Sequence, residues 1–131
     1  MADPAGTGLD EIKAAMASEG FGFSTGAGGV VTQLTSKSTG VTLNKYCGQI
    51  TMHNANLATL TAVAFTVTNS KVATTDTVVV SIDSGATSGA YMVSVGAVGA
   101  GSFEITLFNT TAGTLGEAVV LNFAVVKAVA S

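Results

Sequence analysis

The sequence has few charged and aromatic residues and a single cysteine. Charged residues make up 10% of the chain and aromatic residues 6%, and tryptophan and arginine are absent. Because Cys47 is the only cysteine, an intramolecular disulfide framework and a metal site built from several cysteines are excluded. Five lysines stand against eight acidic residues, so the chain lacks a basic stripe for phosphate contacts. We therefore expect no nucleic-acid partner.

Long hydrophobic runs are also missing, although the mean hydropathy is high at +0.54. No stretch approaches about 18 uninterrupted apolar residues, because Ala, Gly, Val and Thr are interleaved along the chain. Residues 1–8 lack the basic and continuously apolar parts of a secretory signal peptide. We therefore expect no membrane partner and a protein that stays in the compartment where it is made.

Length and composition indicate one folded domain. The chain has 131 residues, of which 47% are hydrophobic and one is proline, unlike a disordered segment. A domain of this size buries about two thirds of the surface that its unfolded chain exposes. About a quarter of the residues in soluble domains are charged. A surface with so few charges is typical of one that faces another protein.

Residues 1–28 are predicted to form an N-terminal arm. Leu9, Ile12 and Met16 fall on one face of a short helix, with a capping threonine before them. Such a helix is marginal alone, so its apolar face needs a partner. Residues 20–29 then hold five glycines and two phenylalanines, which indicates a hinge with apolar anchors. The predicted partner-binding residues are Leu9, Ile12, Met16, Phe21 and Phe23.

Residues 29–131 are predicted to form an all-β domain, because hydrophobic residues recur there with period two. Val63, Phe65 and Val67 alternate with small or polar residues, for example. The predicted strands are Val30–Leu34, Val41–Asn44, Gln49–Met52, Val63–Thr68, Thr77–Ile82, Tyr91–Val98, Phe103–Phe108 and Ala118–Val126. Short polar loops between them favour an antiparallel β-sandwich of about eight strands and exclude a parallel α/β sheet.

The strand order of this sandwich is predicted to be jelly-roll-like. An immunoglobulin-like order is the alternative, but the Cys–Trp–Cys signature of true immunoglobulin domains is missing. The last strand, Ala118–Val126, is largely apolar on both faces. It is therefore either a central strand with a covered outer face or part of a subunit contact, and the sequence leaves both open.

No combination of residues predicts a catalytic or metal site. His53 is the only histidine, and its neighbours in sequence are poor metal ligands. Cys47 would need a bend in the chain to form a nucleophile–base pair with it. Asp76 and Asp83 flank one predicted strand, which places them about 20 Å apart and makes bonds to the local backbone their expected role. We therefore expect no enzymatic activity and no catalytic or metal-binding residues.

Two short motifs also lack a function in this sequence. Gly20, Gly22 and Gly26 do not have the spacing of a dinucleotide-binding loop, so no nucleotide or other cofactor is expected. Asn109–Thr111 matches a glycosylation acceptor, but a turn after the preceding strand explains these residues better. Because no catalytic, metal-binding or nucleotide-binding motif is found, the sequence favours a binding or structural role.

Five segments resemble a small protein that recurs in tailed bacteriophages and prophages. They are Thr35–Lys45, Cys47–Met52, Ser84–Tyr91, Gly101–Ile105 and Glu117–Val125. The likeness covers about residues 21–127 and leaves out the N-terminal helix. This family resembles the β-sandwich head decoration, or cement, proteins, and its motifs are fold signatures that mark no active site.

The resemblance implies a structural virion protein, made in the bacterial cytoplasm and bound to the outer capsid surface. Its implied partners are the major capsid protein and further copies of itself, as a trimer or dimer that stabilises the shell by bridging capsomers. The alternative is a module of a head fibre or tail that binds a glycan on the host surface. Sugar sites usually stack an aromatic ring on the sugar, and Tyr46 and Tyr91 are the only tyrosines. The alternative is therefore the weaker interpretation.

Overall fold

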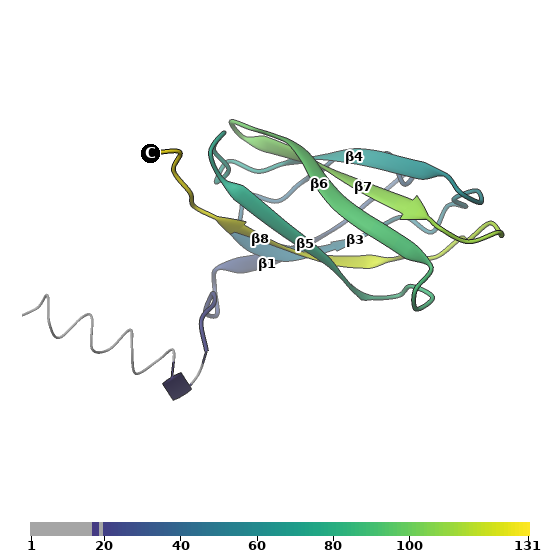
Figure 1. Cartoon of the computed structure of the whole chain (residues 1–131), viewed down its shortest axis with the longest axis horizontal. Helices are drawn as coiled ribbons and strands as arrows, with labels where there is room; N and C mark the ends of the chain where they lie inside the picture. The colour runs from purple at the N-terminus through teal and green to yellow at the C-terminus, as the bar shows by residue number, and fades with distance from the viewer. Residues whose placement is uncertain (1–16, 19) are drawn as a thin grey trace, which may run out of the picture.

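The computed structural model describes residues 17–18 and 20–131, in which eight strands form a β-sandwich (Figure 1). The strands are β1 (Gly28–Thr32), β2 (Val41–Thr42), β3 (Cys47–Thr51), β4 (Ala62–Thr68), β5 (Thr77–Ser84), β6 (Tyr91–Gly99), β7 (Ser102–Asn109) and β8 (Val120–Val126). The all-β prediction is confirmed, and each predicted strand end lies within two residues of the observed one. The predicted helix around Leu9, Ile12 and Met16 lies outside the described residues.

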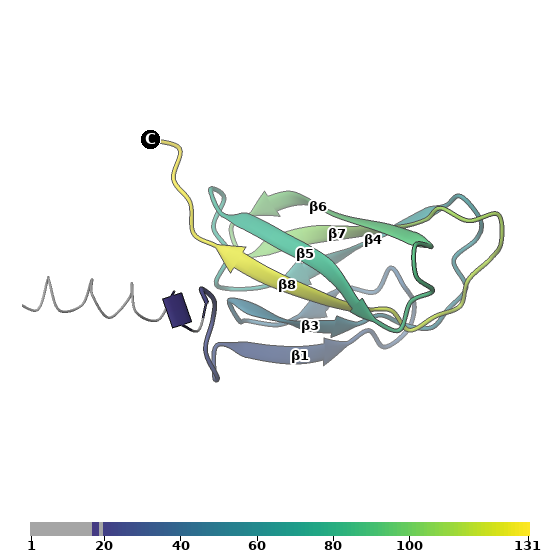
Figure 2. The ribbon, with the colours of Figure 1, turned by 60° about the horizontal axis from the view of Figure 1, so that its bottom comes forward.

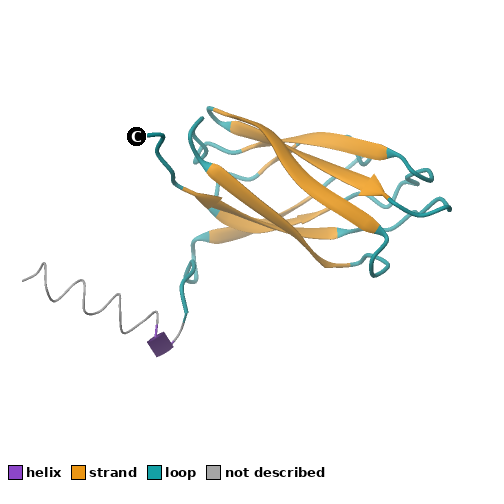
Figure 3. Cartoon of the chain, in the orientation of Figure 1, coloured by secondary structure: helices purple, strands orange, loops and turns teal. Residues whose placement is uncertain are grey.

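The strands form two four-stranded sheets that pack face to face (Figure 2). Sheet A has the order β1–β3–β8–β5, and sheet B has the order β2–β4–β7–β6. Only β6 and β7 are consecutive in the described chain and neighbours in one sheet, so every other connection crosses between sheets. As a result, loops from distant parts of the sequence gather at the two ends of the sandwich (Figure 3).

Strand direction differs from the predicted antiparallel arrangement at two sheet edges. β1 runs parallel to β3, and β2 runs parallel to β4, whereas the other four pairs are antiparallel. A parallel neighbour requires a crossover connection, which the chain makes here by passing through the opposite sheet. Jelly rolls are built from antiparallel Greek keys, and the predicted jelly-roll order is not confirmed.

The core lies between the sheets and consists of alternate residues of the longer strands. The alternation predicted for Val63, Phe65 and Val67 is confirmed, because Phe65 and Val67 are buried and Val63 packs against the core. Two rings from opposite sheets, Phe103 and Phe123, meet with their centroids 5.5 Å apart. The most buried apolar side chains include Ile50, Val67, Ile105, Leu107, Leu121 and Val125. Burial of this apolar set is the main stabilising contribution of the fold.

β8 occupies a central position in sheet A, between β3 and β5. Leu121, Phe123 and Val125 face the core, and the residues between them face outward and are half-buried. The strand is therefore central, as one of the two interpretations required, and Phe21–Phe23 line a pocket with its last residues.

Candidate functional site

The outward-facing side chains of sheet A are small and nearly uncharged. Two rows across the sheet, in the order β1–β3–β8–β5, are Val30, Gln49, Asn122, Ser81 and Gly28, Cys47, Ala124, Val79. We call this surface the sheet A face. Val30 is 76% exposed and Val79 is 53% exposed. Depletion of charged residues distinguishes the centre of protein interfaces from the remaining surface, so the sheet A face is a candidate protein-binding surface.

Asp83 is the one charged residue in the strands of sheet A. Its carboxylate accepts hydrogen bonds from Asn122 Nδ2 at 3.1 Å, from Ser84 Oγ at 3.2 Å and from Gln49 Nε2 at 3.5 Å. The prediction that Asp83 bonds to the local backbone was wrong. Its carboxylate instead bonds to the side chains of Gln49 in β3 and Asn122 in β8. The carboxylate thus ties β3, β5 and β8 together on the sheet A face.

The outer face of sheet B differs from the sheet A face in its charge. Glu104 lies in the middle of this face, in the register row of Thr66 and Gly96. Met92 lies on β6, an edge strand of sheet B, where it pairs with Phe108. Its side chain is 66% exposed. A partner that covered sheet B would have to desolvate the Glu104 carboxylate, whereas the Asp83 carboxylate of sheet A already accepts hydrogen bonds from Asn122, Ser84 and Gln49, so sheet B is less suited to a broad apolar contact.

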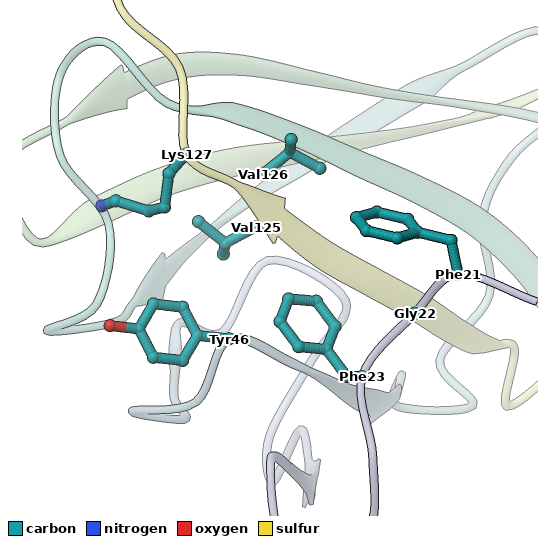
Figure 4. Close-up of a pocket in the computed structure, with 7 residues that line it drawn as sticks. All are labelled: Phe21, Gly22, Phe23, Tyr46, Val125, Val126 and Lys127. Atoms are coloured by element: carbon teal, nitrogen blue, oxygen red, sulfur yellow. The ribbon is translucent and has the colours of Figure 1, made fainter. Parts of the chain in front are cut away.

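Two of the predicted partner-binding residues, Phe21 and Phe23, line a pocket beside the end of β8 (Figure 4). The Phe23 ring stacks on Tyr46, with 6.2 Å between ring centroids and 17° between ring planes. Phe21 is 88% exposed and borders the same pocket. The other predicted partner-binding residues, Leu9, Ile12 and Met16, lie outside the described residues. The structure therefore brings together only the two anchors of the predicted arm.

Comparisons of the chain with family models, with curated proteins and with solved structures found no match.

A buried lysine joins three loops at one end of the sandwich. Lys37 is 3% exposed, and its ammonium donates hydrogen bonds to the carbonyl oxygens of His53 and Glu117, the latter at 2.5 Å. The Gln33 side chain donates to the Lys37 carbonyl at 2.9 Å and accepts from the His53 N–H at 3.0 Å. Burial lowers the pKa of Lys37, and the nearby Glu117 carboxylate partly offsets this effect. These residues act as a structural cluster that fixes the loops.

The Glu117 carboxylate extends this cluster to the loop before β6. It accepts from the Thr87 N–H at 3.1 Å, from Thr87 Oγ1 at 2.9 Å and from the Tyr91 hydroxyl at 2.8 Å. These hydrogen bonds lower the pKa of Glu117, and the bond from the Thr87 N–H has the largest effect. Burial, together with the bond to Glu117, raises the pKa of Tyr91. Sequence analysis missed the cluster because its members are far apart in the chain and match no motif.

The structure separates Cys47 from His53, as the spacing of the sequence required. Cys47 is the first residue of β3, and His53 follows the other end of that strand. His53 Nδ1 accepts a hydrogen bond from the Ala55 N–H at 3.0 Å. Across residues 17–18 and 20–131, no cluster of three or more His, Cys, Asp or Glu side chains is placed to hold a metal ion. Within that same part of the chain, no helix has the length and apolarity needed to cross a bilayer.

Asn109, in the glycosylation-like motif, has a fully buried side chain. Its amide nitrogen donates to the carbonyl oxygens of Leu57 at 3.0 Å, Ala58 at 3.1 Å and Gly113 at 2.8 Å. Its amide oxygen accepts from the Thr111 N–H at 2.9 Å. The side chain therefore holds two loops together and is not accessible to modification in the folded chain.

Asp76 forms an ion pair with Lys127, with 2.6 Å between Oδ2 and Nζ. It also accepts from the Ala73 N–H at 2.8 Å, which is the local backbone bond predicted for a turn carboxylate. The pKa of Asp76 is lowered, mainly by the hydrogen bond from Lys127 and next by the bond from the Ala73 N–H. The pair joins the loop before β5 to the end of β8.

We expect the protein to lose stability in acid, because Asp76 and Glu117 both have lowered pKa values in the folded state. Their contribution is present above the pKa of the unfolded chain, about 4, and is lost as the pH falls through the folded-state pKa. Asp76→Asn should therefore flatten the acid limb of the stability curve, measured by urea denaturation from about pH 7 to about pH 2. An acid limb as steep in the variant as in the wild type would contradict the role of Asp76.

Proposed function

We propose that this chain is a decoration, or cement, protein of a tailed-phage head. In this proposal it binds the outer surface of the capsid and stabilises the shell by bridging neighbouring capsomers. Its partners are the major capsid protein and further copies of itself, as a trimer or dimer. The role is structural and includes no catalytic step.

The residues that carry the resemblance to phage proteins support this proposal by their position. Cys47–Met52 covers β3, and Glu117–Val125 covers most of β8. These two strands pair with each other at the centre of sheet A. Two of the five resembling segments therefore build the centre of the sheet A face, whereas Thr35–Lys45 contains β2 and Gly101–Ile105 contains the start of β7, both in sheet B.

The observation that carries the proposal is that the two central rows of the sheet A face contain no charged residue and include the exposed Val30 and Val79. The one carboxylate that reaches these rows, that of Asp83, accepts hydrogen bonds from Asn122 and Gln49. Apolar contact contributes about 25 cal/mol per Å², so a contact of a few hundred Å² offers several kcal/mol before ordering costs. Repetition over a symmetric shell and bridging of several sites by one oligomer multiply this modest affinity. A small β-sandwich with one face that has few charged residues is therefore sufficient for this role.

The glycan-binding alternative finds less support in the two tyrosines. Tyr91 is buried, and its hydroxyl donates to Glu117. Tyr46 stacks on Phe23, and the Lys71 ammonium lies 5.5 Å from the centre of its ring. Both rings are already engaged within the chain, whereas a sugar site needs a free aromatic face.

We expect the double variant Val30→Lys, Val79→Lys to bind phage heads at least about tenfold more weakly than the wild type, because two ammonium groups would be desolvated in the contact. Both side chains are exposed, so the fold should tolerate the change. Binding is measured by co-sedimentation with heads that were assembled without this protein. Met92→Lys and each single variant, Val30→Lys and Val79→Lys, are compared as well, since all three place one positive charge at an exposed apolar position, and Met92 lies on sheet B. Equal losses in Met92→Lys and in the single variants of sheet A would argue against the sheet A face as the contact.

A further inference from the structure

The pocket beside β8 is an apolar hollow that the described chain leaves open. It has a volume of about 400 Å³ and is lined by Phe21, Gly22, Phe23, Tyr46, Val125, Val126 and Lys127. Figure 4 shows the rings of Phe21 and Phe23 beside the last residues of β8. Phe21 and Val126 remain well exposed. The exposed rings and the exposed end of β8 form a continuous apolar surface of the kind that binds a partner.

Lysines border this pocket. Lys127 lines it, and the Lys71 ammonium lies over the Tyr46 ring. Another lysine of the described chain, Lys37, is buried at the opposite end of β3. Because Asp76 pairs with Lys127, the net positive charge at the border of the pocket comes from Lys71.

The net negative charge of the chain lies in its first 19 residues. Residues 1–19 contain four acidic residues and one lysine, whereas residues 20–131 contain four of each. The whole net side-chain charge of −3 therefore belongs to the first 19 residues. The same segment carries Leu9, Ile12 and Met16 at helical spacing, with Asp10 and Glu11 between them. An acidic segment with an apolar stripe is the complement of a lysine-bordered apolar pocket.

We propose that this pocket binds the N-terminal segment, residues 9–19, of a second copy of the chain. A second copy fits better than the same chain because Phe21–Phe23 already forms one wall of the pocket. Reciprocal docking of two segments makes a closed, isologous dimer.

This inference names the contact behind the self-association that the proposed function includes, and it leaves the sheet A face for the capsid. It assigns all five predicted partner-binding residues to one contact: Leu9, Ile12 and Met16 on the segment, and Phe21 and Phe23 in the pocket. Because the contact forms without a capsid, it is tested in solution. Capsid binding tests the proposed function separately.

The test is sedimentation velocity of the full-length chain over a concentration series, with one variant on each side of the contact. Ile12→Asp places a charge in the apolar stripe, and Val126→Asp places a negative charge at an exposed position of the pocket. Each variant alone should associate at least about tenfold more weakly than the wild type. Met92→Asp, on sheet B, should associate like the wild type.

Mixing the two variants distinguishes docking between copies from docking within one chain. An Ile12→Asp chain keeps an intact pocket and a Val126→Asp chain keeps an intact segment, so the mixture should regain one contact and form heterodimers. Lys71→Glu, which leaves the apolar lining in place, should also weaken association, and high salt should weaken it in the wild type. A wild type that is monomeric throughout, variants that associate like the wild type, or a mixture that remains monomeric would each overturn the proposal.

Discussion

Gly48→Ala is expected to destabilise the fold by about 2–3 kcal/mol, because β1 and β3 approach too closely at this point for a methyl group. A Cβ atom at residue 48 would lie 2.6 Å from the Gly29 carbonyl oxygen and 2.7 Å from Leu43 Cδ2. The first of these atoms is backbone, so relief requires β1 to move away from β3. Since β1 is the edge strand of sheet A, the variant should lose part of the sheet A face together with stability.

Gly96→Ala is the matched control for this prediction. Gly96 also lies within a strand, and a Cβ atom there would meet nothing within 4 Å. We expect its free energy of unfolding to change by less than about 0.5 kcal/mol, since the space is open and alanine reduces the freedom of the unfolded chain. Both variants are measured by urea denaturation. Equal stabilities would show that the parallel pairing of β1 with β3 is looser than the structure indicates.

Asn109→Ala is expected to lower the free energy of unfolding by about 3 kcal/mol, since each buried polar group left without a partner costs about 1–3 kcal/mol. The Asn109 amide donates to three carbonyl oxygens, from Leu57, Ala58 and Gly113. Water has poor access to this site, because the asparagine side chain is fully buried. Loss of the amide therefore frees two loops at one end of the sandwich.

Asn122→Ala provides the comparison at an exposed site. Asn122 lies on the outer side of β8, and its amide donates one described bond, to Asp83 at 3.1 Å. Water replaces that bond readily, so the expected loss is below about 1 kcal/mol. Thermal or urea denaturation of the two variants gives the difference. If Asn109→Ala lowered the free energy of unfolding no more than Asn122→Ala, the interpretation of Asn109 as a buried residue that holds two loops together would be wrong.

The sequence was sufficient to predict the β-sandwich because its strands follow a simple period. Residues such as Phe65 and Val67 alternate with threonine and face a buried core, as period-two patterning requires. The parallel edges could not be predicted, since β1 pairs with β3 through backbone bonds that leave no mark in side-chain periodicity. Strand order depends on contacts between distant parts of the chain, which a local pattern does not encode.

The candidate sites were less predictable than the fold. Lys37 lies in a serine- and threonine-rich loop, where a lysine is normally solvated, yet its ammonium is buried between two carbonyl oxygens. The uncharged face of sheet A becomes visible only when β3 and β8 are placed side by side. Phe21 and Phe23 were identified from their glycine-rich surroundings, and the structure adds the pocket and the lysines around it.

The most direct test of the proposed function is co-sedimentation of the full-length protein with expanded and unexpanded phage heads that were assembled without it. The account predicts saturable binding to expanded heads, at a stoichiometry that matches a local symmetry axis of the shell. It also predicts that the Val30→Lys, Val79→Lys variant competes poorly with the wild type for these sites. Failure of the wild-type protein to bind either kind of head would contradict the decoration role and favour the host-surface module instead.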